Sequence, residues 1–154
     1  MKKIIIIAIM ILLIPFYAFA AGTITQLLDA TPDQAKAVLT FTCTADSSNG
    51  SFPNATTTDA VLAKIKGMYI DEVRTYPQTT NPTALWDAVL NDAGGLDLMG
   101  GTLADRSASA AQRAIPAMAT SIYGGSMIMD APILVITGNS VNSAGIIVKV
   151  FLSK

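Results

Sequence analysis

Strict alternation of apolar and polar residues over positions 36–45 constrains the fold more than any other feature of the sequence. Threonines occupy most positions of one face, and the other face is formed by Ala37, Leu39, Phe41, Cys43 and Ala45. A period of two residues with β-branched side chains is typical of an antiparallel strand with one buried face. Phe41 is therefore expected to point into a core, and Thr42 toward solvent.

Other segments show the same extended character. Strands are expected at 22–28, 65–76, 84–90, 96–99, 122–129, 133–137 and 146–152. The last of these places Ile146, Val148, Val150 and Leu152 on one inward face. Seven to nine strands with no alternation of strand and helix predict an all-β fold. We expect a single antiparallel β-sandwich, with a jelly roll as one form of it.

Two segments leave a choice between strand and helix. Residues 59–66 are compatible with a short helical turn, although 65–76 fits a long strand better. The alternation in that strand changes phase near Ile70 and Asp71, which indicates a β-bulge. Helix propensity favours residues 108–114, and Pro116 would end such a helix.

The stretch 82–106 contains the only tryptophan, Trp86, and is expected to organise the core as a hairpin. Residues 84–90 form its first strand and 96–99 its short return strand. The linking sequence is Asn-Asp-Ala-Gly-Gly at 91–95. Asn, Asp and Gly tolerate the positive φ that tight hairpin turns require.

Residues 1–20 have the composition of a secretory signal peptide. Lys2 and Lys3 precede an apolar run at 4–14, and a small-x-small site ends at Ala20. Cleavage before Ala21 would leave one domain, residues 21–154, exported through Sec to the periplasm or the medium. An uncleaved membrane anchor is the alternative, because the apolar run is near the shortest that spans a bilayer. Contact with a membrane is expected only through this segment before cleavage.

Cysteine content and charge limit the partners. Cys43 is the only cysteine, and it shares the phase of Leu39 and Phe41, so we expect a buried free thiol rather than a bond to another chain. Without residues 1–20 the chain has eight basic and eleven acidic residues, a net charge of about −3. No basic cluster is left to bind nucleic acid.

The charged fraction of the sequence is 14%, against roughly 25% in average soluble domains. Such a surface repels its own copies weakly and loses little solvation on contact. We therefore expect self-association or docking on a larger assembly. A monomeric exported domain rich in Thr and Ser is the alternative.

Little catalytic chemistry is available. The sequence has no histidine, which removes the usual general base, the commonest transition-metal ligand and any Cys–His pair. Two of Asp87, Asp92, Asp97 and Asp105 could form a glycosidase pair. The favoured interpretation is that Asp92 and Asp97 are turn residues and that Asp105 pairs with Arg106. We predict no enzyme and no catalytic residue.

Two ligand classes remain open to such a chain. Asn91, Asp92 and Asp97 offer closely spaced oxygen ligands for calcium, with solvated turn residues as the alternative. Calcium is the only cofactor that the sequence suggests. Aromatic side chains could stack on a glycan, with Trp86 and Tyr76 as the main candidates and Tyr69 and Tyr123 beside them. Asn54, Ala55 and Thr56 also fit a glycosylation sequon, a match that arises easily by chance.

Several short motifs follow one another along the chain: Gly50-Ser51-Phe52-Pro53, Tyr76-Pro77, Asn81-Pro82-Thr83, the strand Leu-Trp-Asp-Ala-Val-Leu-Asn-Asp at 85–92, Asp97-Leu98-Met99-Gly100-Gly101, Ala104-Asp105-Arg106-Ser107 and Gly138-Asn139-Ser140-Val141-Asn142-Ser143-Ala144. In this order the chain resembles small, uncharacterised β-rich proteins of tailed bacteriophages and prophages. The resemblance implies a virion-associated β-domain and supplies no catalytic residues. The sequence thus predicts a non-catalytic structural or surface-interaction protein that is encoded by a phage or prophage. An exported β-sandwich module that binds a glycan or other ligand is the alternative.

Overall fold

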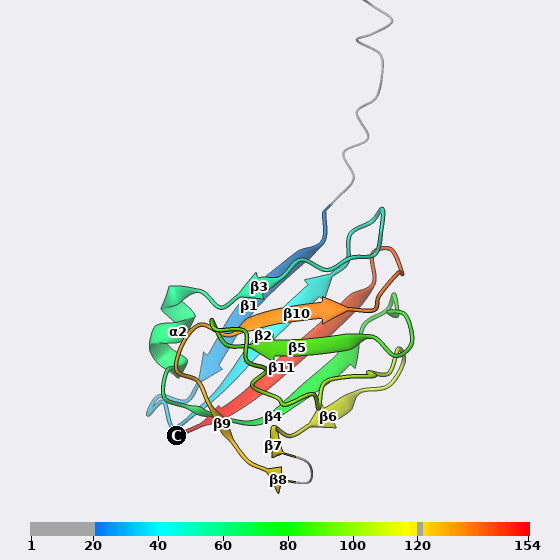
Figure 1. Ribbon diagram of the computed structural model, residues 1–154. Helices are drawn as coiled ribbons and strands as arrows, with labels where there is room; N and C mark the ends of the chain where they lie inside the picture. Colours follow the sequence, from blue (N-terminus) through cyan, green and yellow to red (C-terminus); the bar gives the residue numbers. More distant parts are fainter. Residues whose placement is uncertain (1–20, 120–121) are drawn as a thin grey trace, which may run out of the picture.

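The computed structural model describes residues 21–119 and 122–154, without the side chains of 118–123. The proposed cleavage site before Ala21 and its anchor alternative concern residues outside these ranges. The described residues form an antiparallel β-sandwich with one short helix, as predicted (Figure 1). The elements are β1 Thr23–Ala30, β2 Lys36–Thr44, β3 Ala55–Thr56, α2 Asp59–Ile65, β4 Tyr69–Pro77, β5 Asp87–Asn91, β6 Gln112–Ala114, β7 Ala117–Ala119, β8 Ile122–Tyr123, β9 Ser126–Met127, β10 Ile133–Thr137 and β11 Gly145–Ser153.

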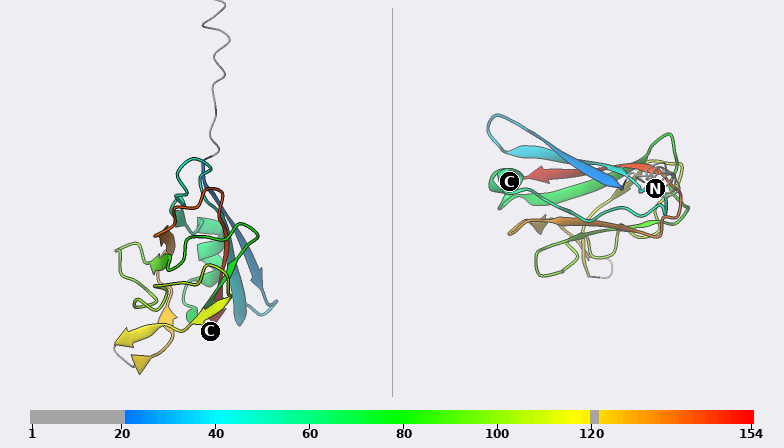
Figure 2. Two further views of the ribbon diagram at one scale, coloured as in Figure 1. Left: turned by 90° about the vertical axis from the view of Figure 1, so that its right-hand side faces the viewer. Right: turned by 90° about the horizontal axis from the view of Figure 1, so that it is seen from above.

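Two sheets face each other across the core (Figure 2). The larger has the order β1-β2-β11-β4-β6, with β9 also beside β4, and the smaller has the order β3-β10-β5. The chain passes repeatedly from one sheet to the other. The last two strands belong to different sheets, and each lies between two earlier strands. β10 lies between β3 and β5, and β11 lies between β2 and β4. This interleaving is of the jelly-roll kind that the sequence left open.

Alternation along β2 and β11 decides which side chains fill the core. Phe41 is fully buried and lies opposite Val148 of β11, which is 1% exposed. The predicted inward faces of both strands are therefore confirmed. Cys43 is buried in the same row, and burial raises the pKa of its thiol to about 12. The thiol is thus protonated at neutral pH and packs as a small apolar side chain.

Between β3 and β4 the chain forms the helix α2, which includes the first residue of the strand predicted over 65–76. Thr58 caps α2, since its hydroxyl oxygen accepts a hydrogen bond from the backbone N–H of Val61 at 3.4 Å. The predicted strand over 65–76 was therefore wrong at its start, and β4 begins only at Tyr69. The predicted β-bulge is confirmed. The register with β11 passes from Glu72 to Ile70, which leaves Asp71 as the extra residue.

The hairpin after β5 forms only in part. Its tight reversal is present, with the Asp92 N–H donating to the Leu96 carbonyl at 2.9 Å. The expected return strand over 96–99 is reduced to a single bridge between Asn91 and Asp97. The chain turns away there and returns further on. The segment 103–106 then lies beside β5, where the Arg106 N–H donates to the Trp86 carbonyl at 2.7 Å.

The other differences between the predicted and the observed secondary structure concern short elements. Residues 108–114 form no helix, and β6 covers three of them. The strand expected at 84–90 starts only at Asp87, because Leu85 has a positive φ of 59°. The described chain has eleven strands rather than seven to nine, because β3, β8 and β9 contain two residues each.

Three of the short sequence motifs meet at one end of the sandwich. The side-chain amide of Asn139 donates to the Gly50 carbonyl and to the Val141 carbonyl. Its oxygen accepts a hydrogen bond from the backbone N–H of Thr83 at 2.8 Å. Ser140 in turn donates its N–H to the Thr83 hydroxyl. These motifs therefore have a structural role, which is to tie three loops together.

Adjacent glycines after β5 give a matched test of local packing. Gly100 has φ of 61°, and a Cβ there would lie 2.0 Å from the Ala117 carbonyl oxygen. Gly101 has φ of 82°, and a Cβ there would meet no atom within 4 Å. We expect Gly101→Ala to lower the free energy of unfolding by about 1–2 kcal/mol, the cost of a left-handed backbone. Gly100→Ala should cost roughly 2–4 kcal/mol, because the clash adds to that strain. Equal urea midpoints for the two variants would contradict the close approach to Ala117.

Candidate functional site

The outward side of the larger sheet is the most distinctive surface of the domain. Side chains of β4 and β11 alternate between buried positions and partly exposed ones. We call the exposed side the outer sheet face. It is formed on these strands and on the neighbouring β2 by Val38, Glu72, Arg74, Tyr76, Ile147, Lys149 and Phe151.

Three cations lie side by side on this face. The register places Lys149 of β11 opposite Arg74 of β4, and Arg74 opposite Arg113 of β6. Like charges directly opposite each other weaken a sheet. One carboxylate lies among them: Glu72 forms an ion pair with Arg74 and lies 3.6 Å from the Arg113 guanidinium. The group keeps two positive charges in excess.

Aromatic rings flank the cations. The guanidinium of Arg74 lies 4.6 Å from the centre of the Phe151 ring, and the Lys149 ammonium 5.9 Å from that of Tyr76. Hydrogen bonds to Tyr76 and then Glu72 raise the pKa of Arg74. The side chain is well exposed, so these contacts orient it more than they stabilise the fold. The face therefore presents ordered positive charge between apolar rings.

Acidic residues gather around β5 of the smaller sheet. Five acidic residues lie on β5, on the turns bound to it, or on the segment beside it: Asp87, Asp92, Asp97, Asp105 and Asp130. We call this set the acidic layer. The basic residue of the adjoining segment, Arg106, is only 5% exposed and contributes little charge to the surface. The outer side of the larger sheet, by contrast, has its three cations together with Glu72 and two further acids, Asp29 opposite Val38 and Asp71 bonded to Ser153.

The predicted stacking role of Trp86 is wrong. Its side chain is 0% exposed and its indole N–H donates to the Ser107 carbonyl at 3.2 Å. It packs in the core because it lies in phase with Ala88 and Leu90 on the inner side of the chain. Tyr76 does lie on the outer sheet face, partly exposed. Tyr69 is 40% exposed at the start of β4, and the side chain of Tyr123 lies outside the described residues.

Of the calcium candidates, Asn91 is the last residue of β5 and pairs with Ile133, while Asp92 and Asp97 serve as turn residues. One oxygen of Asp92 accepts the Leu96 N–H at 2.7 Å. Both oxygens of Asp97 are occupied, by the N–H groups of Met99 and Gly101. Within 21–119 and 122–154 no three His, Cys, Asp or Glu side chains are close enough to hold a metal ion. The geometry therefore favours the alternative interpretation, turn carboxylates.

The expected pair between Asp105 and Arg106 does not form, because the two side chains point to opposite sides of their segment. Asp105 is exposed, and its backbone N–H donates to the Asp87 carboxylate at 2.8 Å. Arg106 reaches across the core to β4, where Nε and one terminal nitrogen donate to the Thr75 hydroxyl at 3.3 and 3.2 Å. Burial lowers the pKa of Arg106. Sequence reasoning missed this contact between the two sheets.

Thr75→Val tests the buried arginine. The substitution keeps the shape of a side chain that is 1% exposed and removes the oxygen that accepts two guanidinium hydrogen bonds. We expect it to lower the free energy of unfolding by about 2–3 kcal/mol, since a buried charged donor is left without its acceptor. Thr42→Val, on the exposed side of β2, is the control and should change it little. Similar chemical denaturation midpoints for both variants would show that Arg106 does not depend on Thr75.

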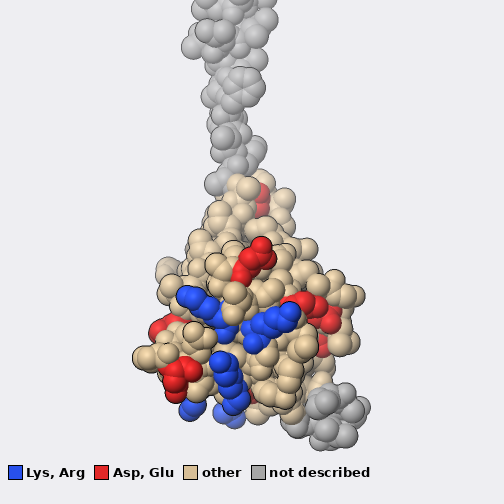
Figure 3. Space-filling view, turned by 90° about the vertical axis from the view of Figure 1, so that its left-hand side faces the viewer, with Lys and Arg blue, Asp and Glu red and all other residues tan. Residues whose placement is uncertain are grey.

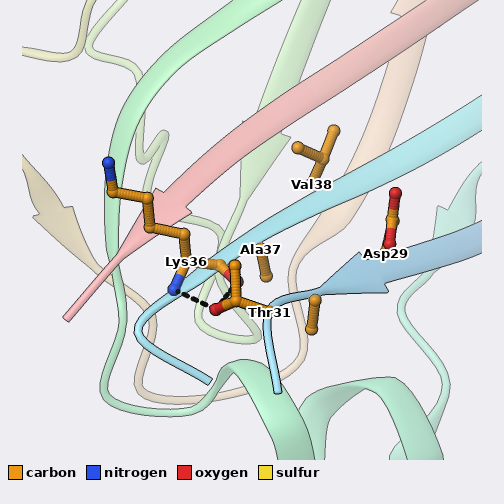
Figure 4. A pocket seen from close by; sticks show the side chains of 6 residues that line it. Asp29, Thr31, Lys36, Ala37 and Val38 are labelled. Carbon is orange, nitrogen blue, oxygen red and sulfur yellow. Dashed lines mark hydrogen bonds between the residues drawn. The ribbon is translucent and has the colours of Figure 1, made fainter. Parts of the chain in front are cut away.

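Hollows are also present on the described surface. One, of about 260 Å³, lies at the end of the β1–β2 hairpin between Asp29 and Val38 (Figure 4). Within it the backbone N–H of Lys36 donates to the Thr31 hydroxyl at 3.1 Å. The other, of about 310 Å³, is lined mainly by apolar residues, including Leu96, Leu98 and Pro116. The first hollow includes Asp29, Thr31 and Lys36 in its lining, and the Thr31 hydroxyl donates to the Asp33 carboxylate at 2.6 Å.

No family model, curated protein or solved structure matches this chain. In the part of the chain that the structure describes, no helix is long and apolar enough to cross a bilayer.

Proposed function

We propose that this chain is a non-catalytic structural or surface-interaction protein, encoded by a phage or prophage and associated with the virion. The observation that carries the proposal is the outer sheet face. A row of three cations between aromatic rings, spread over three strands, fits the surface of another macromolecule better than an enclosed small substrate. The resemblance to phage proteins supports the same role.

The fold is compatible with this role and does not decide it. Jelly-roll domains serve in viral capsids and also in lectins. The low charge of the chain favours association with copies of itself or with a larger array, and the net negative charge of residues 21–154 disfavours nucleic acid. The proposed location is outside the cytoplasm after Sec export, or on the virion. The membrane is then contacted only through residues 1–20, before cleavage.

Expression of the full chain in a Sec-competent bacterium tests both export and assembly. Mass spectrometry should find an N-terminus at Ala21, and intact Met1 in the membrane fraction would contradict cleavage. Light scattering on the processed protein should show a mass that rises with concentration, with or without calcium. A clean monomer at the highest concentration in both buffers would rule out self-association and leave only a different partner.

An exported module that binds a glycan or another ligand is the second candidate. Tyr76 favours it, because this ring is partly exposed on the outer sheet face beside Lys149. Burial of Trp86 removes the other main stacking residue. Binding of the processed protein to immobilised acidic and neutral glycans, lost in Tyr76→Ala, would support this candidate. Equal binding by the two proteins would argue against a stacking role for Tyr76.

A further inference from the structure

The two outward surfaces of the sandwich complement each other. The outer sheet face has partly exposed apolar side chains, Val38, Ile147 and Phe151, beside its row of cations. On the smaller sheet, Val89, Ile133 and Val135 lie outward and partly exposed. These three lie beside the acidic layer, which includes Asp87 on the same strand as Val89. Each surface thus has an apolar part and a charged part. The row of cations Arg74, Arg113 and Lys149 is opposite in charge to the acidic layer, while Asp29 and Asp71 lie further out on the same side of the larger sheet.

A positive and a negative surface on opposite sides of one molecule cannot both be covered by a two-fold contact between identical patches. They can be covered when each copy adds to the next in the same direction, which is a head-to-tail contact. The side of the molecule between them shows no such separation of charge. In Figure 3 basic and acidic residues are interspersed on that side, and most of it is uncharged.

We infer that copies of this chain stack head to tail, with the outer sheet face of one copy on the acidic layer of the next. This inference rests on the self-associating role proposed above and names its contact surfaces. Val38, Ile147 and Phe151 form the apolar part of the contact. Lys149, which lies between Ile147 and Phe151 on β11, and Arg113 on β6 meet acidic residues of the neighbouring copy. Carboxylates of the neighbouring copy would also reduce the repulsion among Arg74, Arg113 and Lys149. Because the two surfaces differ, the contact repeats and builds a ring or a filament.

A different contact competes with this one. β1 is the outer strand of the larger sheet, eight residues long, and pairs with β2 without a register shift. Its side chains include neither Lys nor Pro, the residues that commonly protect such edges. A second copy could add to this edge by backbone hydrogen bonds. That contact would depend little on charge, so charge reversal separates the two possibilities.

The experiment uses two charge-reversed variants of the processed protein. Variant one, Arg113→Glu with Lys149→Glu, makes the outer sheet face acidic. Variant two, Asp87→Lys with Asp105→Lys, reverses part of the acidic layer. We expect each variant alone to be monomeric in sedimentation velocity at concentrations where the unaltered protein associates. An equimolar mixture should associate again, because each reversed surface then meets its complement.

Salt dependence and a matched control complete the test. Raising NaCl from about 50 to 500 mM should weaken association of the unaltered protein by at least about tenfold, since salt screens the attraction between opposite charges across the contact. Lys64→Glu with Lys66→Glu changes the net charge equally on the exposed side of α2 and after it, and should leave association unchanged. Should variant two unfold in a thermal melt, Asp87→Asn with Asp105→Asn replaces it, with weakened association expected.

The outcomes separate this inference from the proposed function. A monomeric unaltered protein would overturn head-to-tail stacking and leave the proposed function to rest on a different partner. Association that persists in the charge-reversed variants, or that is not regained on mixing, would overturn head-to-tail stacking alone. Loss of association in Thr25→Pro, with the charge variants unaffected, would show that copies pair through the edge of β1 instead.

Discussion

Trp86→Ala is expected to lower the free energy of unfolding by about 3–5 kcal/mol, the usual cost of truncating a buried large aromatic side chain. The indole is 0% exposed and belongs to the hydrophobic core, in phase with Ala88 and Leu90. Its N–H also loses the Ser107 carbonyl, to which it donates at 3.2 Å. Domains of this size have about 5–15 kcal/mol of stability in total. Urea unfolding followed by far-UV circular dichroism measures the change without the tryptophan signal.

Leu85→Ala is the matched control for this substitution. Leu85 precedes Trp86 in the chain, but its side chain is 65% exposed. Its removal should change stability by no more than about 0.5 kcal/mol, as most surface substitutions do. A large effect at Leu85 with a small one at Trp86 would mean that Leu85, and not Trp86, points into the core. Acrylamide should also quench Trp86 poorly in the folded protein, and glycans should not change that quenching.

Burial of Trp86 could have been recognised in the sequence. Trp86, Ala88 and Leu90 fall in phase, and all three are buried. The same signal, a period of two residues, correctly predicted the inner faces of β2 and β11. It works because alternation is a local property of an extended chain with one face buried. The prediction that Trp86 stacks on a ligand followed from its residue type alone, whereas its place in the alternation with Ala88 and Leu90 predicts burial.

Other features depend on contacts between distant residues, and local patterns do not reveal them. The cation row joins Arg74, Arg113 and Lys149, which become neighbours only through the pairing of β4 with β6 and β11. Buried Arg106 opposes the general expectation that arginine is exposed, and its acceptor Thr75 lies 31 residues away. The two-residue strands β3, β8 and β9 are too short to show a period at all.

Phe41→Ala should have an effect as large as that of Trp86→Ala, about 3–5 kcal/mol, for a different reason. Phe41 is 0% exposed in the middle of β2, between Gln26 of β1 and Val148 of β11. β2 is an interior strand held on both sides, so the neighbouring backbone cannot easily collapse into the space that the ring leaves. The cost should therefore include a cavity as well as the lost burial. Urea unfolding followed by Trp86 fluorescence reports the loss.

Thr42→Ala tests whether this effect belongs to the inner face. Thr42 is the next residue of the same strand, is exposed, and lies between Thr25 and Ile147. Its replacement should cost at most about 1 kcal/mol, the span of strand preferences measured at exposed sheet positions. The difference between the two variants then measures how strongly the sandwich depends on its inner row. Equal losses of stability would mean that both faces of the larger sheet are covered in solution, which is the result that stacked copies would give at high protein concentration. Repeating both melts at low concentration, where copies separate, should restore the difference.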